Sequence, residues 1–449
     1  MSSPKELSLL TSGNPARRIV IFALPLLVSD FLYVFYTMTD AFIVGRWLGI
    51  NGLAAVGATY SIIGFVSGFI YGLTDGFTVI TAQRVGAGEA EGIRRSIAAG
   101  LTLCLFTSIL LTVLLLPFCR TFLLLTRTPA VIMDDAYGYL LITLSGTFIG
   151  VFSNMLAGIV RAGGDSFTPT VFFVVGIVSN IFLDILCVVV FHWGVSGAAI
   201  ASVFSQFVSC VLFLFFIIRR FSQFLPQKQD WFVGRREYGV HLSLGVSMGL
   251  LQSIVEAGNI LVQAAVNGLG SLTIAAVSAA QRVRGLNMMP VFAVSRAMTT
   301  YTAQNYGAGK MDRVNKGIFQ ACLISLGLGV FMATMNQFTG APIAALFLKD
   351  SPEAVALAHR YILYTGYTVF ILGIMLVFRS SLQGLGMRRA PIICGVMETV
   401  MSILAAFVLI PGLGFTGVCL VNPLSWLASG IPLYIAFGIR KKALLKTQT

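Results

Sequence analysis

The sequence predicts an all-α integral membrane protein with twelve transmembrane helices in two pseudo-twofold-related six-helix bundles. Three observations predict it: an apolar composition, twelve apolar runs of spanning length, and an internal repeat. Of the 449 residues, 57% are hydrophobic and 10% are charged, and the mean hydropathy is +0.89. A soluble domain carries about 25% charged residues. The composition therefore excludes a soluble enzyme, a nucleic-acid-binding protein and a disordered scaffold.

The first element to justify is the set of spans, each of which needs about 20 mostly apolar residues. Twelve apolar runs between polar breaks meet this requirement and leave no room for a separate soluble domain. We expect spans at residues 18–44, 53–80, 96–118, 136–158, 169–191, 197–218, 239–265, 272–300, 316–337, 358–380, 390–410 and 414–438.

Lysine and arginine predict the orientation of these spans, because basic residues collect on the cytosolic side of a membrane. With the N-terminus in the cytosol, cytosolic segments hold 22 basic residues, outer segments hold 5, and 3 lie within the eighth span. We therefore expect a multi-pass protein of the cell membrane with both termini cytosolic. The polar first sixteen residues fit no secretory signal, so we expect the N-terminus to be kept.

The two bundles are predicted by a repeat with an offset near 221 residues. TAQRVGAG at 81–88 recurs as TAQNYGAG at 302–309, and GVSG at 194–197 recurs as GFTG at 414–417. Six spans in each half give both halves the same topology, which is an arrangement used for alternating access. We expect an N-terminal lobe at 1–218, a polar cytosolic linker at 219–238 and a C-terminal lobe at 239–449.

No cofactor motif accompanies this architecture. The GAGK at 307–310 lacks the first glycine of a phosphate-binding loop and is followed by Met311. The seven cysteines form no CxxC pair and have no histidine partner, and the three histidines are scattered. We therefore expect neither an enzyme nor a cofactor, so uphill transport would have to use an ion gradient.

Asp40 and Asp184 are the most informative intramembrane charges. Each lies seven or eight residues before the outer end of an outward-running span, roughly 10–12 Å deep. Asn180 is one helical turn from Asp184 on the same face. Two carboxyl groups in one low-dielectric pocket would bind a proton, and with the amide oxygen they could also hold a small cation such as Na⁺. The alternative is that each side chain only hydrogen-bonds a neighbouring helix.

Other intramembrane charges have less specific interpretations. Asp75 and Arg296 are separated by 221 residues, so they occupy equivalent positions in the two halves. A salt bridge between them would form a gate, whereas a local pair within each bundle is the alternative that we favour. Glu256 and Glu398 would each meet a cationic substrate or pair with an arginine. Pro25, fifteen residues before Asp40, predicts a bend in the first span.

Taken in order, the motifs resemble those of the multidrug and toxic compound extrusion (MATE) family over essentially the whole chain. Each motif is weak alone, and the combination is specific. The matching segments are Pro25, Tyr36 and Asp40 with IVGRWLG at 43–49, AAVG at 54–57, the QRVGAG and QNYGAG repeats, RAGGD at 161–165 with Pro169, and Asn180 with Asp184.

The resemblance implies roles for individual residues. Asp40, Asn180 and Asp184 resemble the N-lobe cation site of the DinF-like branch, with Ser202 where that branch often has threonine. Tyr36 and Asn154 match positions near the N-lobe cavity, and Glu256 resembles the span-seven acid of the NorM-like branch. The tenth span contains no acidic residue, so the C-lobe site of the NorM-like branch is incomplete, which favours coupling in the N-lobe.

The resemblance implies an antiporter that exports amphipathic or cationic organic compounds in exchange for H⁺ or Na⁺. Its expected partners are small-molecule substrates and the lipid bilayer, without nucleic acid, and one chain holding both bundles is expected to act as a monomer. A flippase for a lipid-linked precursor remains the alternative. That activity would call for a more basic central cavity, for which only Arg282, Arg284 and Arg296 are available.

Overall fold

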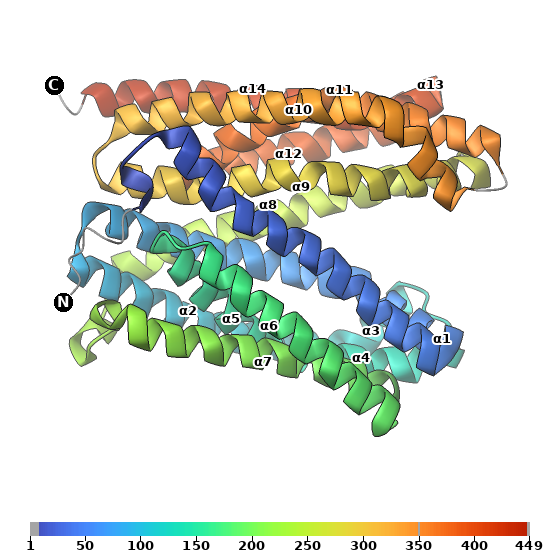
Figure 1. Ribbon diagram of the computed structural model, residues 1–449, viewed down its shortest axis with the longest axis horizontal. Helices are drawn as coiled ribbons and strands as arrows, with labels where there is room; N and C mark the ends of the chain where they lie inside the picture. The colour runs from blue at the N-terminus through green and yellow to red at the C-terminus, as the bar shows by residue number, and fades with distance from the viewer. Residues whose placement is uncertain (1–8, 349–350, 447–449) are drawn as a thin grey trace. The chain divides into compact units, whose positions relative to one another are not determined.

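The computed structural model describes residues 9–348 and 351–446, and every regular element in these ranges is a helix (Figure 1). The predicted all-α class is confirmed. The longer helices are α1 (Pro15–Ala87), α2 (Ala90–Leu115), α4 (Met133–Ser145), α5 (Thr147–Ala162), α6 (Phe167–Asp184), α7 (Gly194–Arg220), α8 (Arg235–Asn267), α9 (Ser271–Gly307), α10 (Met311–Phe347), α11 (Pro352–Gly384), α12 (Arg389–Leu404) and α14 (Phe415–Lys446).

Shorter elements connect or extend these helices. Two of them, η5 and η8, are π-helical and continue α6 and α12 directly. The short elements are η2 (Leu9–Thr11), η3 (Leu116–Phe118), α3 (Cys119–Leu125), η4 (Ala130–Ile132), η5 (Ile185–Val190), η6 (Ser222–Phe224), η7 (Lys228–Trp231), η8 (Ala405–Leu409) and α13 (Ile410–Leu413).

Hydropathy and length identify the membrane-spanning helices. In the described ranges, 9 helices are long and apolar enough to cross a membrane, and the pair at Ala130–Ser145 and Thr147–Ala162, bent by 44°, makes a tenth span. At 73 residues α1 is long enough for two spans, and its backbone leaves the helical conformation at Gly49. Counting α1 twice and adding α9, whose three arginines lower its hydropathy, gives the twelve predicted spans.

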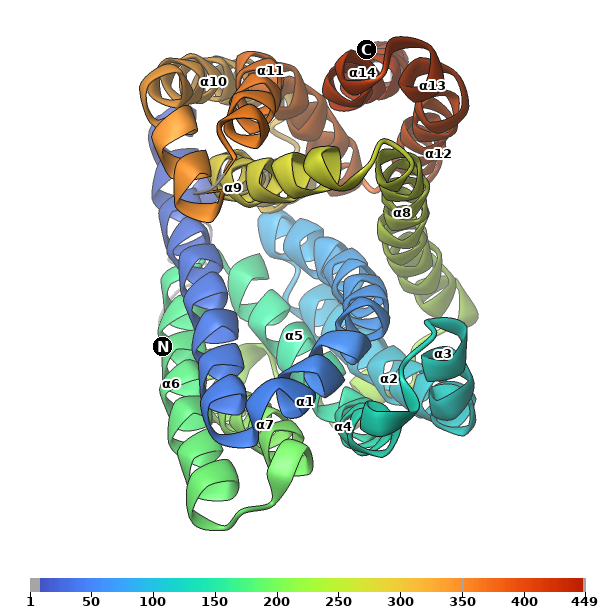
Figure 2. The same ribbon diagram turned by 90° about the vertical axis from the view of Figure 1, so that its right-hand side faces the viewer.

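Packing divides the chain into two compact units. Unit 1 is Val28–Gly249, and unit 2 consists of residues 9–27 and 250–446. In unit 1, α7 packs against α4, α5 and α6 (Figure 2). In unit 2, α11 packs against α9, α10 and α14.

The first helix of each half contributes to both units. The predicted lobe boundaries follow the sequence repeat, whereas packing assigns the start of α1 to unit 2 and residues 235–249 of α8 to unit 1. The lobe boundaries therefore stay a prediction.

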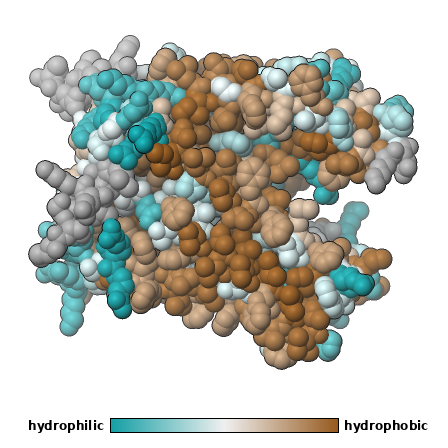
Figure 3. Space-filling model, in the orientation of Figure 1, coloured by the Kyte–Doolittle hydropathy of each residue, from teal (hydrophilic) through white to brown (hydrophobic). Residues whose placement is uncertain are grey.

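On the face shown in Figure 3, hydrophobic residues cover the middle of the helices in each unit and hydrophilic residues gather towards the helix ends.

The start of α1 is held firmly in unit 2, where it runs beside α9 and α10 (Figure 1). Ile19 and Phe22 are buried in the apolar core of this unit. Arg313 on α10 donates through Nη1 to the carbonyl of Gly13 (2.8 Å), and Asn305 on α9 donates to the carbonyl of Leu10 (3.1 Å). Residues 9–27 are therefore part of the unit formed mainly by the second half of the chain.

The sequence repeat reappears in the backbone. Glycines with positive φ occur in pairs separated by 220–222 residues, and each lies at a helix end, at a helix start or at a break within a helix, where a side chain would be strained. The pairs are Gly49 with Gly270, Gly88 with Gly309, Gly164 with Gly386, and Gly194 with Gly414. The π-helical segments η5 and η8 are a further pair, beginning at Ile185 and Ala405. The two halves are thus built on one backbone plan.

Candidate functional site

The carboxyl groups of Asp40 on α1 and Asp184 on α6 meet inside unit 1. They interact directly, within reach of a hydrogen bond between them. Asp184 is 0% exposed. Oδ1 of each residue is buried and has no hydrogen-bond donor among the described residues. Two carboxylates this close repel each other unless a proton or a cation lies between them.

Asn180 orients one side of this pair. When its amide nitrogen faces Asp184, it donates to Asp184 Oδ2 over 2.9 Å, and its oxygen accepts the backbone N–H of Ser202 over 3.3 Å. This orientation satisfies both ends of the amide, which is 1% exposed. One carboxylate oxygen of Asp184 therefore has a fixed donor, whereas the other has none among the described residues.

Ser202 on α7 connects the pair to two tyrosines. Its hydroxyl lies 3.2 Å from the hydroxyl of Tyr36 on α1. Tyr139 on α4 lies close to Ser202, Asp40 and Asp184. Tyr139 was not predicted from the sequence, because no motif surrounds it and only the packing of α4 against α7 brings it here.

These residues come from four helices of unit 1, namely α1, α4, α6 and α7. On α1, Tyr36 and Asp40 are four residues apart and so lie on one face, and the same spacing puts Asn180 and Asp184 on one face of α6. Immediately after Asp184, the chain becomes π-helical at Ile185, and such segments are frequent at functional sites. The arrangement can bind a proton or a small cation with carboxyl and hydroxyl oxygens. We call Asp40, Asp184, Asn180 and Ser202 the carboxylate site.

The structure places the remaining predicted residues elsewhere. Asn154 on α5 donates its amide to the carbonyl of Gly150 in its own helix over 3.0 Å, and no hydrogen bond joins it to the carboxylate site among the described residues. Pro25 lies within α1, in the part of this helix that belongs to unit 2 and ends at Leu27.

Asp75 forms the local pair that we favoured over a gate. Arg161 on α5 donates through Nη2 to Asp75 Oδ1 over 3.1 Å within unit 1. Arg296, its counterpart in the repeat, is an exposed residue of α9 in unit 2. The carboxylate of Asp75 is thus already neutralised inside its own unit.

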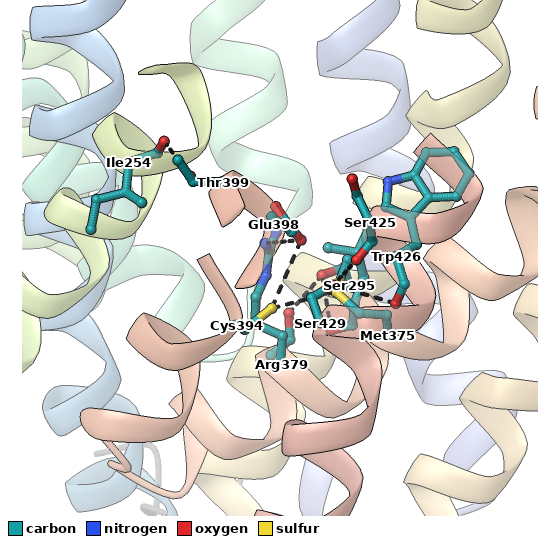
Figure 4. Close-up of polar contacts among 12 residues, drawn as sticks. Ile254, Ser295, Met375, Arg379, Cys394, Glu398, Thr399, Ser425, Trp426 and Ser429 are labelled. Atoms are coloured by element: carbon teal, nitrogen blue, oxygen red, sulfur yellow. Dashed lines mark hydrogen bonds and ion pairs between the residues drawn. The ribbon is translucent and has the colours of Figure 1, made fainter. Parts of the chain in front are cut away.

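The acidic residues of unit 2 have different surroundings. Glu256 on α8 is exposed and accepts a hydrogen bond from Asn259 over 3.1 Å. Glu398 on α12 is buried, with its Oε1 3.7 Å from Arg379 Nη1 and 3.8 Å from the thiol of Cys394 (Figure 4). A buried acid beside an arginine forms a charge-compensated pair, so Glu256 is the more accessible acid for a substrate.

An ion pair outside the spans fixes the linker to unit 1. Asp230 in η7 accepts the backbone N–H of Gln227 over 2.9 Å and Nε of Arg94 on α2 over 2.8 Å. These two donors, the backbone N–H first, hold the pKa of Asp230 below its ordinary value, although burial opposes them. The linker is therefore anchored by a charge-assisted contact.

The family profile described as MatE matches residues 25–186 and 248–408, which cover much of each half of the chain and include Asp40, Asn180 and Asp184. The chain belongs to the MatE family. The resemblance predicted from the motifs is confirmed, and the chain is a transporter and not an enzyme. It is a multi-pass membrane protein that acts on small molecules, and transporters of this family need no cofactor.

Curated relatives cover most of this MatE chain. It is 26% identical over 380 residues to the probable multidrug resistance protein YpnP of Bacillus subtilis (strain 168), covering 84% of each chain. It is 26% identical over 396 residues to the probable multidrug resistance protein NorM of Thermotoga maritima, covering 84% of this chain and 82% of that protein. It is also 22% identical over 432 residues to a protein named FAD transporter in Shewanella oneidensis, covering 95% of each.

Solved structures agree with the fold of this MatE chain. A crystal structure of a MATE protein in the bent conformation superimposes with a TM-score of 0.92 at 22% identity, over 99% of both chains. An outward-facing multidrug resistance MATE transporter gives a TM-score of 0.90 at 22% identity, over 99% of this chain and 100% of that one. At this identity the likeness shows the fold alone.

Proposed function

We propose that this protein is a secondary active antiporter that exports amphipathic, cationic organic compounds in exchange for an ion bound at the carboxylate site. The observation that carries the proposal is the pair of buried Oδ1 atoms on Asp40 and Asp184 that lack a hydrogen-bond donor. A proton or cation arriving there satisfies both oxygens and removes the repulsion between the two carboxylates. Relatives named multidrug resistance proteins support export of drugs as the task.

Two features favour H⁺ over Na⁺ as the coupling ion. A proton shared by two carboxyl groups needs only the contact that Asp40 and Asp184 already make. A sodium ion would need further oxygen ligands, and the oxygen of Asn180 is engaged by the backbone N–H of Ser202. We therefore propose H⁺ exchange, with Na⁺ as the alternative to be tested.

In the proposed cycle, the site takes up the ion while it is open to the outside, and the loss of negative charge lowers the attraction for a cationic substrate. Release of the ion to the cytosol restores the charge and allows the next substrate to bind. Both termini are cytosolic in this proposal, and a single chain carries out the whole cycle. Glu256 is the acid through which unit 2 meets the cationic group.

Dye efflux from proteoliposomes tests the proposal under an imposed pH gradient and, separately, an imposed Na⁺ gradient. We expect gradient-driven efflux by the wild type and its loss in Asp40→Asn and in Asp184→Asn. The matched control is Asp135→Asn, which removes an exposed carboxylate from α4 in the same unit and should leave efflux unchanged. The gradient that drives efflux identifies the ion.

Two outcomes would contradict the proposal. Efflux that survives both substitutions would move coupling out of the carboxylate site and direct attention to Glu256 and Glu398. Absence of dye movement by the wild type under either gradient would favour the flippase, which would then be assayed with a fluorescent lipid-linked pyrophosphate in the same vesicles.

A further inference from the structure

Helix α9 carries a concentration of positive charge that the carboxylate site does not explain. Its 37 residues include three arginines and no acidic residue. Arg284 lies 13 residues after Ser271, the first residue of α9. It is therefore roughly 20 Å along the axis from the start of the helix. A charged side chain near the middle of a bilayer costs at least about 2.5–3.5 kcal/mol, so such residues have partners or functions.

Arg284 is held in place by two neutral side chains from other helices of unit 2. Its Nη1 donates to Oδ1 of Asn422 on α14 over 2.8 Å, and Nδ2 of Asn422 donates to the hydroxyl of Tyr361 on α11 over 3.0 Å. Tyr361 is 2% exposed. The amide nitrogen of Asn422 donates to the tyrosine hydroxyl, so the amide oxygen faces the guanidinium of Arg284. This contact fixes the position of the guanidinium.

The charge of Arg284 is not neutralised by this arrangement. Arg161 and Arg379 each lie within 4 Å of a carboxylate, at 3.1 Å and 3.7 Å, whereas Arg284 pairs with no carboxylate in the part of the chain that the structure describes. A guanidinium has five N–H donors, and Asn422 engages one of them. Arg284 is partly exposed, so its remaining donors are accessible.

A positioned, uncompensated guanidinium with vacant donors matches the planar, bidentate geometry of a carboxylate or phosphate. We propose that Arg284 is the centre of a subsite for the anionic group of an amphipathic substrate, and that Asn422 and Tyr361 are its positioning residues. The substrates assigned to this subsite are therefore amphiphiles that carry a carboxylate or a phosphate. That these compounds are exported rests on the proposed function, whereas their binding at Arg284 does not.

Binding to the purified full chain in lipid nanodiscs tests this subsite with two pairs of fluorescent probes. Norfloxacin and its methyl ester differ by one carboxylate, and flavin mononucleotide and riboflavin differ by one phosphate. We expect the wild type to bind the carboxylate- or phosphate-bearing member of at least one pair about tenfold more tightly, as a charge-assisted hydrogen bond gives. The pair that shows the preference identifies the anion. Equal affinity within both pairs would overturn the proposal.

Variants assign the preference to the residue. Arg284→Gln should abolish it while leaving unchanged the affinity for the member of each pair that lacks the carboxylate or phosphate. Asn422→Asp is a second test in a chain of nearly unchanged shape, because its new carboxylate would neutralise Arg284 internally and also abolish the preference. The matched control is Arg360→Gln, since Arg360 on α11 also bonds a neutral group, Thr416, over 3.0 Å, but lies only eight residues after Pro352.

A preference that persists in both Arg284→Gln and Asn422→Asp, or that is lost in Arg360→Gln, would refute the assignment to Arg284. The measurement is independent of transport. A chain that binds anions through Arg284 but shows no gradient-driven efflux would retain the subsite and contradict the antiporter. Gradient-driven efflux without an anion preference would support the antiporter and contradict the subsite at Arg284.

Discussion

Asn180 and Asp184 lie one turn apart on α6, and the amide nitrogen of the first donates to the carboxylate of the second over 2.9 Å. Asn180→Ala removes this donor and leaves a buried carboxylate oxygen unpaired, at a cost of about 1–3 kcal/mol. We expect the initial rate of gradient-driven efflux to fall about tenfold or more in proteoliposomes. Asn51→Ala, an exposed position on α1, should retain the wild-type rate, and equal rates in all three proteins would show that the amide is not needed.

The stability contributed by the ion pair between Asp75 and Arg161 should require opposite charges at the two positions, whichever position carries which charge. Both side chains are partly exposed, so each single substitution is expected to cost no more than about 1 kcal/mol. We expect the exchanged variant Asp75→Arg with Arg161→Asp to recover most of the melting temperature lost by either single variant. Recovery in Asp75→Arg with Arg296→Asp instead would support the gate between the repeats.

Substitution of Gly49 should lower the stability of the protein because of the backbone conformation at this residue, and not because of a clash with neighbouring atoms. Its φ is 71° and its ψ is −167°, and an added Cβ would meet no atom within 4 Å. Since this conformation is essentially restricted to glycine, Gly49→Ala should destabilise the protein by about 1–3 kcal/mol. Gly57→Ala, a helical position with equally open space, should be neutral or stabilising. Equal melting temperatures for the two variants would contradict this account.

Asp230 should make stability depend on pH. Because its pKa is lowered in the folded protein by Gln227 and Arg94, its contribution is complete above the unfolded value near 4 and is lost as the pH falls through the folded value. The melting temperature of Asp230→Asn should therefore lie below that of the wild type at pH 7, and the gap should close as the pH falls below about 4. A gap independent of pH would contradict the assignment.

The sequence was sufficient to select the main residues of the carboxylate site, because helical spacing places Asn180 on the same face as Asp184 and the resemblance adds Asp40 and Ser202. It did not identify Tyr139, since a tyrosine in an apolar span has no distinguishing signal until α4 packs against α7. It also could not distinguish the two partners offered for Asp75. Arg161 becomes its neighbour only through the packing of α5.

Local chemistry by itself determined the spans, the repeat and the family, because apolar runs, glycine positions and motifs are each properties of neighbouring residues. Only the tertiary structure decided which charges are compensated. Glu398 has Arg379 beside it, Asp75 has Arg161, and Arg284 has the neutral side chain of Asn422. The physical reason is that compensation depends on distances between helices far apart in the chain, and in a low-dielectric interior a few ångströms separate a neutralised charge from one available to a ligand.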